Sequence, residues 1–124
     1  MKKKKNNSLI KSFYHAFVGI KTSFLEETKI IIHFSIMTLV IILGIVLSIN
    51  FTEWMTCLIL FSLVISFEMV NTAIEITLDA CIPEINISVK KAKDISAGAV
   101  LMAAIVSAII GLMIFIPKII AIIK

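Results

Sequence analysis

Four polar residues, three of them acidic, lie at helical spacing inside an otherwise apolar stretch of the chain. They stand at i, i+3, i+7 and i+11, and they are Glu68, Asn71, Glu75 and Asp79. This spacing places all four on one face of a helix. A carboxylate inside a membrane-spanning or fully buried helix is costly unless it is paired, so each is a functional-site candidate by default.

The residue types around this stretch are those that phosphoryl transfer needs. Magnesium is typically held through one or two carboxylates while the phosphates of the substrate supply further oxygens. The candidate oxygen ligands and phosphate-binding cations are Glu27, Glu75, Asp79, Lys90, Lys91 and Lys93. Glu68 lies roughly 10 Å deeper than Glu75 along the helix. From that depth a partly desolvated carboxylate can act as a general base toward a lipid hydroxyl.

The composition indicates an integral membrane protein. Hydrophobic residues make up 60% of the 124 positions, and the mean hydropathy is +1.09, both far above the usual globular range. The apolar residues fall in long runs, not in short alternations, which favours helices over a transmembrane barrel. We therefore predict a single all-α domain of three transmembrane helices preceded by an amphipathic interfacial helix.

The hydropathy pattern divides the chain into segments. In chain order they are a disordered basic tail at 1–7, a surface helix at 8–28, spans at 30–49, 54–79 and 96–116, and a loop at 80–95. Pro117 is expected to end or kink the third span. Ten of the twelve lysines precede the first span or lie in the 80–95 loop, so the positive-inside rule places both segments in the cytoplasm.

The charges argue against nucleic acid as a partner. The net charge is +4, but every basic residue is a lysine, and no aromatic residues are interleaved with the N-terminal lysines. Readers of nucleic acid rely heavily on arginine. The sequence also lacks a Walker-type Gly-x-x-x-x-Gly-Lys stretch, so any nucleotide site must be of another kind.

Two motifs resemble those of the bacterial diacylglycerol kinase and undecaprenol kinase family. They are the Glu-x-x-Asn-x-x-x-Glu-x-x-x-Asp of 68–79 and the Ala-Lys-Asp of 92–94, and Ser12, Phe13, Ala16, Gly19, Glu27 and His33 extend the resemblance over nearly the whole chain. The resemblance implies a homotrimer in the bacterial cell membrane, with active sites formed between neighbouring subunits. It also implies ATP-dependent, magnesium-dependent phosphorylation of a lipid hydroxyl.

The same resemblance implies a role for individual residues. Glu68 would be the catalytic base and would meet the lipid substrate together with Ala97, while Glu27 and Glu75 would bind magnesium. The residues implied to bind ATP are His15, Glu27, Glu75, Glu84, Ile85, Asn86, Lys93 and Asp94. Asn71 and Asp79 would support the active site.

Other interpretations of these residues stay open at this point. His33 is expected to make a core or headgroup contact and not to act as a catalyst, and Lys90 and Lys91 are expected to anchor at headgroups. The residues at His33 and at 69–72 resemble the Gram-positive undecaprenol kinases more than the diacylglycerol enzymes, and this resemblance implies undecaprenol as the acceptor. A different class of function is a non-enzymatic membrane subunit, or a helical oligomer whose acidic stripe conducts cations or protons.

Overall fold

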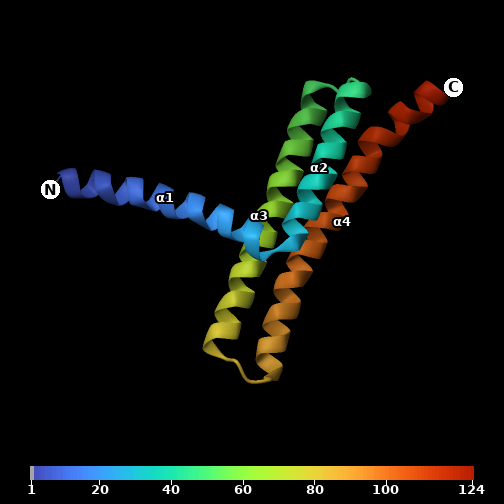
Figure 1. Ribbon diagram of the computed structural model, residues 1–124. Helices are drawn as coiled ribbons and strands as arrows, with labels where there is room; N and C mark the ends of the chain where they lie inside the picture. The colour runs from blue at the N-terminus through green and yellow to red at the C-terminus, as the bar shows by residue number, and fades with distance from the viewer. Residues whose placement is uncertain (1) are drawn as a thin grey trace.

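The computed structural model describes the backbone of residues 2–124 and the side chains from Asn7 onward. This part of the chain forms helices joined by short connections and contains no strand. The helices are α1 (Lys2–Glu26), α2 (Thr28–Val46), α3 (Phe51–Cys81) and α4 (Ile87–Ile123) (Figure 1). The last three are long and apolar enough to cross a membrane. The predicted all-α class with three candidate spans is confirmed.

Several helix boundaries differ from those expected. The helix α1 begins at Lys2, so the backbone of 2–7 is helical where a disordered tail was predicted, while Met1 lies outside the described residues. Lysine has a favourable helix propensity, and this lets the helix extend into the basic run. The loop expected over 80–95 is reduced to the segment between α3 and α4, because residues 87–95 are helical.

Local sequence explains where this loop begins and ends. Ile82 precedes Pro83 and takes the non-helical angles φ −136° and ψ 78°, as a residue before proline prefers. At the other end the side-chain Oδ1 of Asn86 accepts a hydrogen bond from the backbone N–H of Ser88 at 2.8 Å. Asn86 therefore caps α4 and lets the helix start well before the apolar span.

The helix α4 also continues through Pro117, which was expected to end or kink the third span at 116. Proline has no N–H to bond the carbonyl of Met113, so the helix loses one internal hydrogen bond there. Figure 1 shows the C-terminal end of α4 leaning away from α2 and α3. Lys118, one residue further on, forms an ion pair with Glu53 at 3.2 Å.

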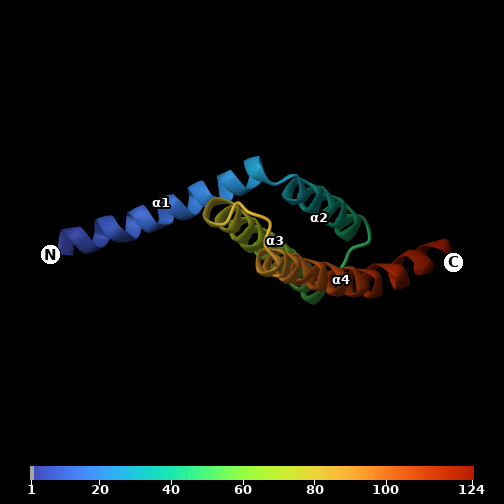
Figure 2. The same cartoon turned by 90° about the horizontal axis from the view of Figure 1, so that it is seen from below.

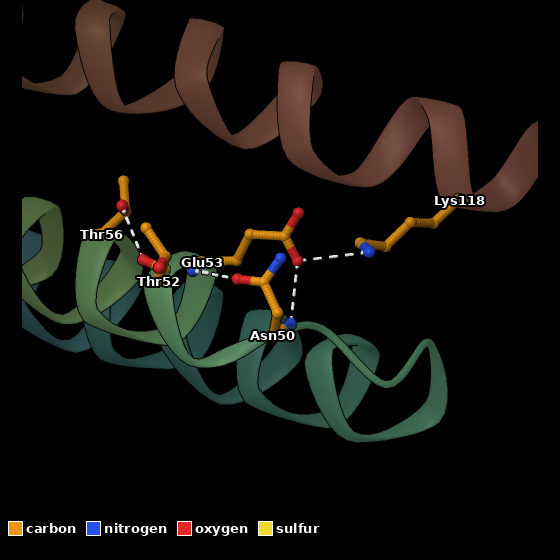
Figure 3. Close-up of polar contacts among 5 residues, drawn as sticks. All are labelled: Asn50, Thr52, Glu53, Thr56 and Lys118. Carbon is orange, nitrogen blue, oxygen red and sulfur yellow. Dashed lines mark hydrogen bonds and ion pairs between the residues drawn. The ribbon is translucent and has the colours of Figure 1, made fainter.

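The turn between α2 and α3 is fixed by a reciprocal cap, and Figure 3 shows its contacts. The Oδ1 of Asn50 accepts from the backbone N–H of Glu53, and the Glu53 carboxylate accepts from the backbone N–H of Asn50, each at 2.9 Å. Ser48 in the same turn has a positive φ of 51°. The carboxylate of Glu53 also meets Lys118, so the cap ties the start of α3 to the end of α4.

The apolar core of the chain lies at this same end. Ile49, Cys57 and Phe115 are buried together there, with Trp54 packed against them. The indole of Trp54 on α3 packs directly on the α2 backbone: a Cβ placed on Gly44 would lie 2.7 Å from the Cη2 atom of Trp54. Only glycine leaves room for the indole ring at this position.

The remaining packing positions the polar half of the bundle. Both α2 and α4 pack against α3, while α1 leaves the bundle at a steep angle and contacts α2 and α3 through its C-terminal end (Figures 1 and 2). There the ring centroids of Phe24 and Phe34 lie 4.7 Å apart, and those of Phe34 and Phe61 lie 4.9 Å apart. The junction of α1 and α2 thus meets α3 midway along its length, beside the acidic residues.

Candidate active site

Glu68 is the most enclosed ionisable side chain in the described part of the chain. It is 1% exposed, and neither of its carboxylate oxygens has a hydrogen-bond partner among the described residues. Burying a carboxylate without a hydrogen bond destabilises the folded state. Packing alone therefore gives no reason for a glutamate at this position. Its nearest basic neighbour among the described residues is His33 on α2, whose Nε2 lies 3.7 Å from the Oε2 of Glu68.

Other charged groups gather around this carboxylate. The charges of Lys29, Glu27 and Glu75 all act on Glu68, in addition to that of His33. Glu27 and Lys29 come from the junction of α1 and α2, and Glu75 lies two turns further along α3. The structure therefore brings together three predicted site residues, Glu27, Glu68 and Glu75, within one chain.

The position of Glu27 follows from its role as a helix cap. Its backbone is extended, with φ −126° and ψ 109°, and its Oε1 accepts from the backbone N–H of Lys29 at 3.3 Å. This contact fixes the carboxylate at the positive end of the α2 dipole, where an anion is stabilised. The second carboxylate oxygen remains available for another ligand.

Asn71 links α3 to α4 one turn further along the acidic stripe. It is fully buried, and its Oδ1 accepts a hydrogen bond from the hydroxyl of Ser96 at 2.6 Å. The hydroxyl of Thr72 is also buried and donates to the backbone carbonyl of Glu68 at 2.9 Å. These bonds leave little freedom for the α3 backbone beside Glu68, so that carboxylate has a rigid support.

The candidates at the end of the bundle where α3 meets α4 are paired with one another. Lys93 on α4 forms an ion pair with Asp79 on α3, and Lys90 pairs with Asp94 one turn away at 2.7 Å. Asp79, Lys90 and Asp94 are exposed, so these pairs are screened by water and are weak. A polyanionic ligand can therefore replace Asp79 and Asp94 as the partner of these lysines at little cost in free energy.

The remaining predicted residues lie at separate places. Glu84, Ile85 and Asn86 form the exposed connection between α3 and α4, and Ala97 is exposed on α4 next to Ser96. His15 is exposed on α1, where it lines a groove of about 370 Å³. Met69, Thr72 and Ala73 of α3 form the opposite wall of this groove. No hydrogen bond or ion pair between side chains that the structure describes joins His15 to residues 84–86.

The acidic side chains of the site indicate how a metal ion could be bound. Within the described residues no group of three or more histidine, cysteine, aspartate or glutamate side chains has the geometry to hold a metal by itself. Two carboxylates, Glu27 and Glu75, nevertheless act on the same buried site. This set fits magnesium that is bound chiefly through the phosphates of a nucleotide, since such an ion needs only one or two protein carboxylates.

Sequence reasoning missed two contacts of this site. His33 was expected to be a core or headgroup contact, and it proves to lie beside the candidate base Glu68, 3.7 Å from its carboxylate. Ser96 was not a candidate, yet it holds Asn71. The helical spacing of Lys29 and His33, at i and i+4, and of Lys93 and Ser96, at i and i+3, puts each pair on one face and was the available signal.

Comparisons with known proteins identify the family of the chain. Residues 14–115 match the family model described as prokaryotic diacylglycerol kinase. The chain is 39% identical over 112 residues to the undecaprenol kinase of Bacillus subtilis (strain 168), an alignment that covers 90% of this chain and 91% of that relative. No solved structure matches the chain significantly.

Proposed function

The chain belongs to the prokaryotic diacylglycerol kinase family and is a membrane lipid kinase, and we propose that it transfers the γ-phosphate of Mg-ATP to the hydroxyl of undecaprenol. Diacylglycerol is the other acceptor to be considered. The preference for undecaprenol is supported by the relative from Bacillus subtilis, which carries that name. Membership of a kinase family removes the support for a non-enzymatic membrane subunit.

The observation that carries the proposal is the buried carboxylate of Glu68. It is enclosed, it lacks a hydrogen-bond partner among the described residues, and it lies inside an apolar helix. A base in this position is able to reach a hydroxyl presented by a lipid, and its burial keeps water from competing with that hydroxyl. In this proposal Glu68 removes the proton of the lipid hydroxyl as its oxygen attacks the γ-phosphorus, and Ala97 lines the path of the lipid.

Magnesium and ATP complete the proposed site. Glu27 and Glu75 hold the metal, which supplies charge neutralisation for the phosphates when it is bound. The proposed contacts to the rest of the nucleotide are His15, Glu84, Ile85, Asn86, Lys93 and Asp94. Asn71 and Asp79 support them from α3, Asn71 through Ser96 and Asp79 through its ion pair with Lys93.

The proposal extends to the assembly and its orientation. Residues 8–124 form a single lipid-kinase domain, and three copies of it associate as a homotrimer. The helix α1 lies in the membrane interface, which suits its long exposed stretch of mixed apolar and basic side chains. The lysine distribution places the N-terminus and the connection at residues 82–86 in the cytoplasm, where ATP is available.

A phosphate-transfer assay tests this function. The detergent-purified protein receives Mg-ATP with undecaprenol or diacylglycerol, each at the same mole fraction, and the phosphorylated lipid is measured. We expect faster transfer to undecaprenol, and we expect a magnesium chelator to stop the reaction. Faster transfer to diacylglycerol would overturn the proposed acceptor, and transfer to neither lipid would overturn the proposed function as a whole.

A further inference from the structure

A base as enclosed as Glu68 must be able to release the proton that it takes. The side chain is 1% exposed and is not bonded to any other side chain that the structure describes. After each transfer the carboxyl group would remain protonated, and a protonated carboxyl cannot serve as a base for the next lipid. Turnover therefore requires a neighbouring group that accepts the proton and has access to water.

His33 meets both conditions. Its Nε2 lies 3.7 Å from the Oε2 of Glu68, and its side chain is 21% exposed. This separation is longer than a hydrogen bond, but contacts of this kind often shorten when substrate is bound, or are bridged by one water. His33 lies one helical turn beyond Lys29, at the end of α2 that begins at the α1 junction. In the proposed orientation this end of α2 faces the cytoplasm, so the partly exposed imidazole lies beside the buried carboxylate near the water-facing end of the helix.

The other ionisable groups near Glu68 are less suited to the task. Lys29 approaches from the first turn of α2, but a lysine ammonium has no lone pair with which to accept a proton. Glu27 and Glu75 approach from the α1–α2 junction and from α3, and both are committed to magnesium in the proposed function. A neutral imidazole has an acceptor nitrogen, and the imidazolium that it forms can donate the proton to water.

We propose that His33 is the proton relay of this kinase, taking the proton from Glu68 after each transfer and passing it to water on the cytoplasmic side. This inference rests on the proposed function. The lipid hydroxyl gives its proton to the Glu68 carboxylate as the new P–O bond forms and the bond to the ADP leaving group breaks. The carboxyl then gives the proton to Nε2 of His33, and the imidazolium releases it to water or buffer.

Two substitutions at one position separate a relay from a structural role. In His33→Ala the imidazole is removed and a space is left, so we expect kcat to fall at least about tenfold with the KM values for ATP and lipid little changed. Imidazole added to the buffer should restore most of the lost rate. In His33→Gln an N–H donor is kept but no proton can be carried, so kcat should fall as far as in His33→Ala.

The matched control is Ser35→Ala, two residues away on α2, where the lost hydroxyl bonds only the backbone carbonyl of Ile31. It should keep the wild-type rate. Wild-type kcat in His33→Gln, or a loss in His33→Ala that imidazole does not restore, would overturn the relay. Wild-type protein assayed in parallel keeps the two proposals distinguishable, because absence of lipid phosphorylation there would refute the kinase function itself.

Discussion

At the scale of single residues, the site is built around a charge that the fold does not need for stability. Glu68 is buried without a hydrogen-bond partner among the described residues, and its nearest basic neighbours are His33 and the more distant Lys29. Isolated carboxylates in low-dielectric surroundings destabilise the folded state. A residue that costs stability and is nevertheless present is expected to serve activity.

Replacing this carboxylate by its amide should therefore separate stability from activity. In Glu68→Gln we expect lipid phosphorylation to fall at least about 100-fold, because the amide cannot accept a proton. Thermal stability in detergent should be unchanged or higher, since the buried charge is gone. ATP affinity, measured by equilibrium binding, should stay close to that of the wild type. Near-normal turnover would remove Glu68 from the role of base.

Glu75 offers a separate test of the metal site. It is half-buried, one of the carboxylates whose charge acts on Glu68, and we expect Glu75→Gln to weaken binding of Mg-ATP about tenfold or more. The measurement is nucleotide affinity with and without magnesium. Glu26→Gln is the matched control, because Glu26 is exposed at the end of α1. Equal affinities in the two variants would argue against a role for Glu75 in metal binding.

The acidic stripe itself was predictable from sequence, while its partners were not. Helical spacing alone puts Glu68 and Asn71 on one face of α3. The contacts of that face with His33 and Ser96 depend on how α2 and α4 pack against α3, and neither helix is close to α3 in sequence at these points. Spacing identifies residues that share a face, but it does not identify the helix that the face meets.

At the scale of elements, α3 has two different ends. Its first turns join an apolar cluster with Ile49, Cys57 and Phe115, while its later turns carry buried polar side chains toward α2 and α4. At the apolar end the indole of Trp54 packs directly on Gly44, with no room for a Cβ there. This division indicates that the apolar end supplies packing and the polar end supplies chemistry.

Two glycine substitutions test this division. Alanine at Gly44 or at Gly111 should gain the same helix propensity of about 1 kcal/mol. At Gly44 the new methyl group would lie 2.7 Å from Trp54, whereas no atom outside the local helix backbone lies within 4 Å at Gly111. We expect Gly44→Ala to be less stable than Gly111→Ala by about 1–3 kcal/mol in unfolding measurements, because the indole must move. Equal stabilities would show that this contact is not tight.

Helix ends were less predictable than helix centres. Hydropathy locates the apolar centre of a span. The ends of the helix depend instead on whether its terminal N–H and C=O groups find hydrogen-bond partners, which capping residues supply. The cap at Asn86 extends α4 in the N-terminal direction, and the ion pair between Lys118 and Glu53 holds the segment beyond Pro117. Helix α4 is accordingly longer at both ends than the expected third span of 96–116.

At the scale of the whole molecule, one chain leaves much apolar surface uncovered. Leu101, Ile105 and Ile109 on α4 are exposed, as are many apolar residues of α2 and α3. Lipid covers part of this surface. The small side chains of α4 also permit close helix packing between copies, which supports the proposed homotrimer. The helix α1 points away from its own bundle (Figure 1).

This direction of α1 leads to a test of shared active sites. We expect the purified kinase to have three times the chain mass of 13.7 kDa after correction for detergent. Two variants, Glu68→Gln and a deletion of residues 2–15, should each be inactive while keeping the trimer mass. If the α1 of one subunit completes the site of its neighbour, random one-to-one mixing should restore about a quarter of wild-type activity. About one site in four then combines an intact α1 from one copy with an intact Glu68 from another.

The mixing experiment distinguishes sites shared between subunits from sites confined to one subunit. If α1 served only the site of its own chain, every mixed trimer would still lack either α1 or Glu68 at each site, and activity would stay at the level of the separate variants. Recovered activity would also place His15, which α1 carries, beside the Glu68 of a different copy. That outcome would explain why the contacts of His15 within one chain do not reach residues 84–86.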